Sequence, residues 1–96
     1  MELTKVANGD QLKVSINGRL DTSTAVEAEA FFNENLAGVK SLIIDCENLS
    51  YISSAGLRVL LSIQKKMNSG LKLVNVQELV MEVFEMTGFS DILAIE

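Results

Sequence analysis

The sequence contains no histidine, no proline and no tryptophan, and it has one cysteine. Without imidazole there is no Ser-His-Asp or Cys-His nucleophile and no zinc site that needs histidine. The lone Cys46 has no partner for an internal disulfide or a CxxC motif, which is typical of a reducing compartment. With 5% aromatic residues the chain also lacks a stacking platform for single-stranded nucleic acid or sugars.

Long hydrophobic runs are also absent. Runs such as residues 42–44 and 59–61 are far too short to span a bilayer, and the first five residues lack the basic-then-apolar order of a signal peptide. We therefore expect a soluble, cytoplasmic protein. Its 8 basic and 13 acidic side chains give a net charge of −5, which predicts neither nucleic-acid binding nor direct membrane binding.

The length of 96 residues and a hydrophobic fraction of 48% predict one domain over residues 1–96. A chain of this size buries roughly two-thirds of the surface that its unfolded form exposes, so it can fold without disulfides. Turn residues at 8–10 separate a short strand at 3–7 from an alternating strand at 12–16, which predicts an antiparallel hairpin that ends at Gly18.

Three helices and two further strands follow. Thr24 and Glu27 have capping-box spacing at the start of the first helix, and Gly38 follows its end. The apolar run at 41–46 predicts a strand that is covered on both faces. Apolar spacing then predicts a helix at 55–67, with a buried stripe of Leu57, Leu60, Leu61 and Met67. A strand follows at 71–76. The third helix, at 77–87, has an apolar set of Leu79, Val80, Val83, Phe84 and Met86, and a tail at 89–95 packs on the core.

This order predicts an α/β fold. Right-handed crossovers make the later strands parallel, so we expect a small mixed sheet of four strands, antiparallel at its first edge and then parallel. The helices should cover mainly one face of this sheet.

The segment 45–61 combines a buried strand, a loop and a helix that opens with Ser53 and Ser54. A serine at this position commonly caps the helix, and the residues alone favour that role for Ser54. A helix start also stabilises a phosphate, and the helical wheel places Ser54 on the surface beside Arg58. Neither serine has the Glu or Gln of a capping box, and Gly56 is a weak helix former, so a modified Ser54 stays open as an alternative.

At this point the sequence resembles the STAS domain family, and within it the stand-alone bacterial anti-sigma factor antagonists. The resemblance spans nearly the whole chain and depends on four groups of residues: 52–57 with Asp45 and Leu49, 18–21, 43–45 and 87–89. It implies that Ser54 is the phosphoacceptor and that Asp21 and Asp45 serve phosphorylation and partner binding. Many family members have Asp-Ser-Ser-Gly, whereas this chain has Ser53 and Ala55 around the acceptor, so Ser53 is a second candidate.

The resemblance further implies a binding protein without a cofactor, not an enzyme. Its expected partners are an anti-sigma factor that is also a serine kinase of the histidine-kinase-like ATPase type, and a metal-dependent PP2C-type serine phosphatase. The unphosphorylated protein would bind the anti-sigma factor and release a sigma factor, and the protein itself would be a monomer or weak dimer. The predicted partner surface comprises Asp21, Thr22, Asp45, Ser53, Ala55, Gly56, Arg58 and Val59.

Alternative interpretations accompany several residues. Asp21 is as well explained as a helix cap. Asp45 and Glu47 form a candidate acid/base pair, but no metal ligand or third polar group accompanies them, which disfavours catalysis. Val59 lies opposite the buried stripe, either against the first helix or as an exposed anchor. Cys46, Met81 and Met86 are interpreted as core residues. For the whole chain, the alternative function is a constitutive STAS subunit of an ABC-type lipid or anion transport complex.

Overall fold

The computed structural model describes residues 1–96 and confirms the mixed α/β class. The strands are Glu2–Asn8 (β1), Gln11–Leu20 (β2), Ser41–Asp45 (β3), Leu49–Ile52 (β4) and Leu71–Val74 (β5). The helices are Ala25–Asn35 (α1), Ser54–Met67 (α2) and Glu78–Thr87 (α3), with short 3-10 turns at Asn68–Gly70 and Phe89–Asp91. None of the helices has the length and apolar character needed to cross a membrane.

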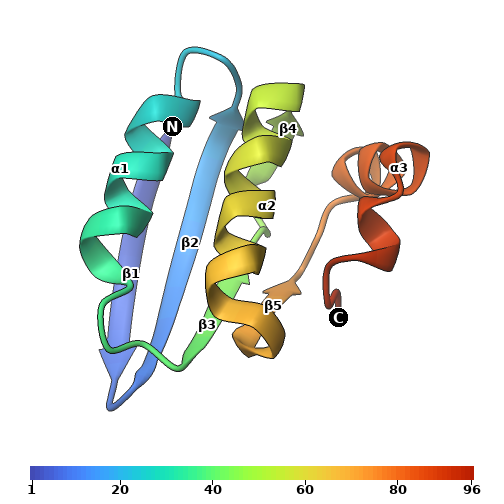
Figure 1. Ribbon diagram of the computed structural model, residues 1–96. Coiled ribbons are helices and arrows are strands. Elements are labelled where there is room, and N and C mark those ends of the chain that lie inside the picture. Colours follow the sequence, from blue (N-terminus) through green and yellow to red (C-terminus); the bar gives the residue numbers. More distant parts are fainter.

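The sheet follows the predicted topology (Figure 1). β1 and β2 form an antiparallel hairpin, closed by a two-residue loop in which Gly9 has a φ of +64°. β2, β3 and β5 are then parallel neighbours. The sheet has five strands, because β4 also pairs with β2 in parallel. We did not predict this strand, whose four residues lie between polar loops and bury only Leu49 and Ile52.

Gly18 does not end the second strand, contrary to our prediction. It adopts a φ of +104°, and the pairing register with β4 shifts between Gly18 and Arg19. Glycine tolerates this backbone conformation, so β2 bends here and continues to Leu20. The first half of β2 therefore pairs with β3, and its last residues pair with β4.

Helices α1 and α2 lie side by side on one face of the sheet (Figure 1), as expected. Ala25, Ala28 and Phe32 of α1 are buried against the sheet. The opposite face is open, so β3 is not covered on both faces: Leu42 and Ile44 are buried, and the alternating Ser41, Ile43 and Asp45 are only half-buried. Because residues 42–44 are all apolar, the sequence did not show that their burial alternates.

The buried stripe of α2 is broader than predicted. Leu57 and Leu60 are buried, but Leu61 and Met67 are half-buried, and Val59 and Ile63 are buried in their place. Val59 is only 4% exposed. It is therefore a core residue and not an exposed anchor.

Helix α3 stands apart from the α1–α2 pair and packs against β4 (Figure 1). Val80 and Phe84 are buried, whereas Leu79 is 66% and Met86 is 86% exposed. Contrary to our prediction, Leu79 and Met86 therefore lie outside the core. The predicted return of the tail is confirmed, because Leu93 is buried and Ile95 forms a parallel bridge with Leu73 of β5.

Candidate functional site

The first turn of α2 separates the roles of the two serines. Ser53 is the N-cap, with an extended backbone, and its side-chain oxygen accepts a hydrogen bond from the Gly56 N–H at 3.3 Å. Ser54 is the first residue of the helix; it is exposed, and its hydroxyl has no hydrogen-bond partner in the protein. The capping role that the residues had favoured for Ser54 thus belongs to Ser53.

Gly56 fixes the start of this helix against the end of β2. A Cβ atom at Gly56 would lie 2.7 Å from the Leu20 carbonyl oxygen and 2.8 Å from Cγ1 of Ile52. The Ser53 N–H also donates to the Leu20 carbonyl at 2.9 Å. The two serines are therefore held beside the carboxyl end of β2, next to the loop that follows Leu20.

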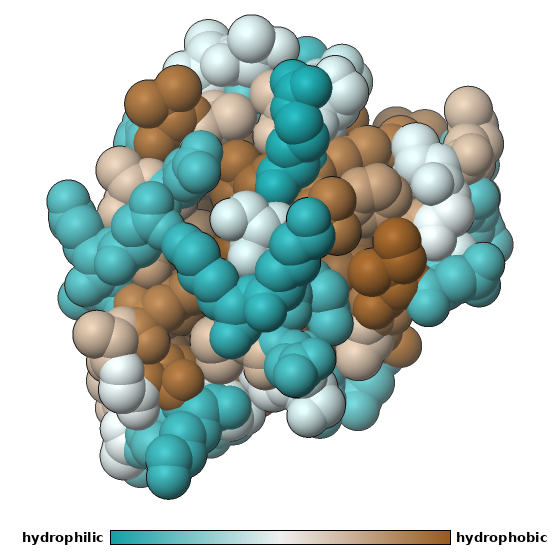
Figure 2. All heavy atoms as spheres, viewed as in Figure 1, coloured by the Kyte–Doolittle hydropathy of each residue, from teal (hydrophilic) through white to brown (hydrophobic).

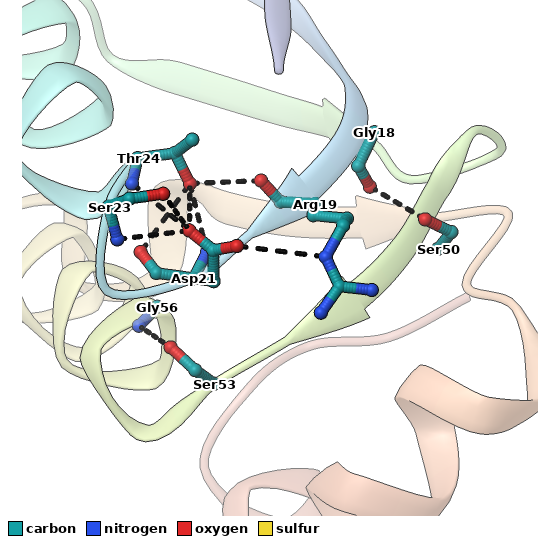
Figure 3. A network of polar contacts seen from close by, with 8 residues as sticks. All are labelled: Gly18, Arg19, Asp21, Ser23, Thr24, Ser50, Ser53 and Gly56. Carbon is teal, nitrogen blue, oxygen red and sulfur yellow. Dashed lines mark hydrogen bonds and ion pairs between the residues drawn. The ribbon is translucent and has the colours of Figure 1, made fainter.

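Asp21 organises the loop between β2 and α1 (Figure 3). Its Oδ1 accepts hydrogen bonds from the Ser23 hydroxyl at 2.7 Å, the Ser23 N–H at 3.0 Å and the Thr24 N–H at 3.2 Å. The predicted Thr24–Glu27 capping box is absent, because the Thr24 side chain makes no cap bond. The Thr24 hydroxyl instead donates to the Arg19 carbonyl and accepts from the Asp21 N–H, each at 2.9 Å.

These donors keep Asp21 ionised. The hydrogen bond from the Ser23 hydroxyl is the largest cause of a pKa of Asp21 below its ordinary value, and the backbone N–H groups of Ser23 and Thr24 lower it further. On its other side, Asp21 Oδ2 lies 3.6 Å from Nε of Arg19 (Figure 3). The Arg19 guanidinium in turn stacks over the Tyr51 ring, 4.1 Å from its centroid. Contacts from Asp21 through Arg19 to Tyr51 thus link this loop to β4.

Arg19 and Tyr51 are site residues that our sequence analysis did not single out. Arg19 lies within the 18–21 motif, which was a usable signal. The signal for Tyr51 was weaker, because its contact with Arg19 depends on the pairing of β4 with β2.

Asp45 lies away from this cluster. It pairs with Ser15, whereas Ile52 pairs with Leu20, five residues further along β2, which corresponds to about 16 Å of strand. Ser54 follows Ile52 and is directed to the same far end of β2. The Asp45 carboxylate instead contacts three structural partners: the Glu47 N–H at 3.0 Å, the Asn75 side-chain amide at 3.1 Å and the Lys13 amine at 3.9 Å.

The other predicted surface residues differ in accessibility. Thr22 and Arg58 are exposed and Ala55 is half-buried, so each can contact a partner. Gly56 and Val59 are buried, which limits them to positioning the helix. The chain contains no cluster of three metal-ligating side chains. Burial, followed by the Asp45 charge, raises the pKa of the Cys46 thiol to about 12, as fits a core residue.

A family model described as the STAS domain matches residues 2–96. The chain belongs to the STAS domain family. Among its relatives, BtrV of Bordetella bronchiseptica, provisionally named an anti-sigma factor antagonist, is 33% identical over 96% of this chain and 83% of its own length. The anti-sigma-B factor antagonist of Staphylococcus aureus is 28% identical over 84% of this chain and 79% of its own length.

Solved structures share the fold of this STAS domain. An anti-sigma factor antagonist from Mycobacterium paratuberculosis superposes with a TM-score of 0.88, at 21% identity over 98% of this chain and 83% of that one. The phosphorylated form of Bacillus SpoIIAA gives 0.74, at 18% identity over 99% and 91%. A sulfate transporter family protein from Wolinella succinogenes gives 0.77, at 20% identity over 94% and 76%.

Proposed function

We propose that this STAS domain is an anti-sigma factor antagonist that is switched off by phosphorylation of Ser54. In its unphosphorylated state it binds an anti-sigma factor through the start of α2 and the adjoining Asp21 loop, and a sigma factor is thereby released. The observation that supports the proposal most directly is that two adjacent serines have different roles in the structure. Ser53 makes the helix cap, so the exposed Ser54 hydroxyl is free to react.

The chemistry of the switch is a phosphoryl transfer. The Ser54 Oγ forms a bond to the γ-phosphorus of ATP, the bond between that phosphorus and the β–γ bridging oxygen breaks, ADP leaves, and the hydroxyl proton passes to the kinase. This chain supplies only the acceptor, and the catalytic groups belong to the kinase. The new phosphate lies at the positive end of α2, which stabilises it without a change of fold.

The new charge disrupts binding. A phosphoserine carries about −1.5 to −2 charges at neutral pH, and an interface that accepted a neutral hydroxyl must desolvate or repel them. A penalty of about 3 kcal/mol lowers affinity by roughly a hundredfold or more, which is sufficient for a switch. The ionised Asp21 places a second negative charge on the same surface.

The proposed partners are an anti-sigma factor with serine kinase activity of the histidine-kinase-like ATPase type, and a PP2C-type phosphatase that restores the free hydroxyl. The names of the two curated relatives support an anti-sigma factor as partner. The docking residues are the accessible members of the predicted set: Asp21, Thr22, Ser53, Ala55 and Arg58. Gly56 and Val59 position the helix without contacting the partner, and Asp45 lies outside this surface.

Incubation with the anti-sigma factor kinase and ATP, followed by intact-mass analysis and peptide mapping, tests the proposal. We expect one phosphate on the parent protein and on Ser53→Ala, and none on Ser54→Ala, which should bind its partner permanently. Ser54→Asp should fold but bind poorly. Phosphorylation of Ser54→Ala to the parent level would identify Ser53 as the acceptor and overturn the assignment.

The second candidate is a constitutive subunit of an ABC-type lipid or anion transport complex, which the fold shared with the Wolinella succinogenes protein keeps open. Affinity capture under native conditions discriminates the two. A histidine-kinase-like ATPase in the captured complex favours the switch, whereas an ABC ATPase that binds equally to Ser54→Ala and Ser54→Asp favours the transport subunit.

A further inference from the structure

The net charge of the protein is confined to its C-terminal quarter. Residues 1–72 contain all 8 basic side chains and 8 of the 13 acidic ones, so their charges cancel. Residues 73–96 contain the other 5 acidic side chains and no basic one, which accounts for the whole net charge of −5. All five of these acidic residues lie on α3 or in the tail that follows it, and α3 stands apart from the α1–α2 pair (Figure 1).

Helix α3 presents its carboxylates as a stripe. Glu78, Glu82 and Glu85 follow helical spacing along one side, are all exposed and make no ion pair within the protein. Like charges four residues apart repel, and Glu85 in the last turn opposes the helix dipole. Glu78 in the first turn is favoured by the dipole, so the unfavourable part of the stripe is Glu82 with Glu85, and an external cation would relieve their repulsion.

An apolar groove runs beside this stripe, between α3 and β4. Its volume is about 250 Å³, and Leu79, Val83 and Met86 of α3 line one wall while Tyr51 and Ile52 of β4 line the other. Leu79 is 66% and Met86 86% exposed, whereas the inward-facing Val80 is buried. On the face drawn in Figure 2, hydrophobic surface also gathers between α2 and α3.

We propose that this groove is a docking site for a basic amphipathic segment of a partner protein. Apolar side chains of the segment fill the groove, and its Lys or Arg residues pair with Glu78, Glu82 and Glu85. The groove is smaller than the sites that enclose whole small molecules, so it suits a few side chains that are presented on a segment. The proposal does not depend on Ser54 being a phosphoacceptor.

The charge distribution disfavours the other occupants of such a groove. A second copy of this chain would place two regions of charge −5 against each other, which opposes dimerisation through this face. A fatty acid or an anionic lipid would bring a further negative charge to the Glu82 edge. Arg19, which stacks over the Tyr51 ring of the groove, is already paired with Asp21.

The test is a titration of the full chain with a synthetic 18-residue amphipathic helix of leucine and lysine, followed by backbone NMR shifts at physiological salt. We expect the shifts to concentrate at Tyr51, Leu79, Val83 and Met86. Leu79→Ser should lower the affinity about tenfold, because it removes one large apolar side chain from the α3 wall of the groove. Glu82→Gln should weaken binding a few-fold and reduce its salt dependence.

Matched controls separate the groove from general attraction to an acidic protein. Val26 is 76% exposed on α1, so Val26→Ser and Glu29→Gln on the same helix should leave binding unchanged. A peptide with glutamate in place of lysine and a peptide of scrambled order should both fail to bind. The proposal is overturned if the shifts lie on α1, if Val26→Ser or Glu29→Gln weakens binding as much as Leu79→Ser or Glu82→Gln, or if either control peptide binds like the leucine–lysine peptide. It is also overturned if sedimentation shows a dimer through this groove, or if a dodecanoate titration shows that a fatty acid binds there.

Discussion

The sharpest consequence of the first turn of α2 is that its two adjacent serines should respond oppositely to truncation. In Ser53→Ala the helix loses the acceptor for the Gly56 N–H, which is a hydrogen bond of 3.3 Å. In Ser54→Ala no hydrogen bond is lost, because the Ser54 hydroxyl has no partner in the protein. The two variants remove the same atom from neighbouring positions, so each is the control for the other.

The magnitude follows from the cap geometry. Loss of an N-cap serine typically costs about 1 kcal/mol, and a donor–acceptor distance of 3.3 Å, slightly longer than is usual, places Ser53 somewhat below that value. Alanine is a slightly better helix former than serine, so Ser54→Ala should be neutral or stabilising by a few tenths of a kcal/mol. For a domain of about 100 residues, 1 kcal/mol shifts the Tm by roughly 4–8 °C.

Thermal and urea unfolding followed by circular dichroism measure this difference directly. We expect Ser53→Ala to have the lower midpoint with an unchanged m-value, since the extent of unfolding is the same. Equal losses in the two variants, or a larger loss in Ser54→Ala, would refute the division of roles between cap and acceptor. It would also remove the reason why Ser54 is available for phosphorylation.

Three further predictions concern the surroundings of the site. Gly56→Ala should lower the free energy of unfolding in urea by about 1–2 kcal/mol, because the clash with the Leu20 carbonyl outweighs the gain of about 1 kcal/mol in helix propensity. An unchanged midpoint would contradict the close approach of Gly56 to Leu20. The Asp21 carboxyl should titrate below its ordinary value of 3.8 when it is followed by NMR. Because folding lowers its pKa, its contribution to stability is present above pH 3.8 and is lost as the pH falls through the folded pKa. The Asp21→Asn variant should not show this loss. Cys46 should resist iodoacetamide at pH 8 and react once the protein is unfolded, because burial raises its pKa to about 12; rapid labelling of the native protein would contradict this.

Sequence periodicity predicted most of the fold for identifiable reasons. The hairpin, α1 and the return of the tail followed from alternation, helical spacing and turn residues in stretches of clear pattern. It failed where context overrides pattern: Gly18 bends a strand instead of ending it, because the chain beyond it finds a new partner in β4. β4 itself carries only two buried residues, which is too few for a periodic signal.

The site divides in the same way. The pair of serines at the start of a helix and the surface position of Ser54 followed from the residues. Which serine caps the helix did not, because that depends on whether the first helical residue is 54 or 55. The separation of Asp45 from Ser54 depends equally on strand register, which no local pattern encodes.

The sequence by itself determined the α/β class, the order of most elements, the absence of imidazole chemistry and the confinement of net charge to the last 24 residues, because these depend on composition and local periodicity. Only the tertiary structure decided that Val59 is buried while Leu79 and Met86 are exposed, and that Arg19 meets Asp21 and Tyr51. The physical reason is that burial and long-range contact are properties of packed elements. A helix presents the same apolar residues whether or not a neighbour covers them.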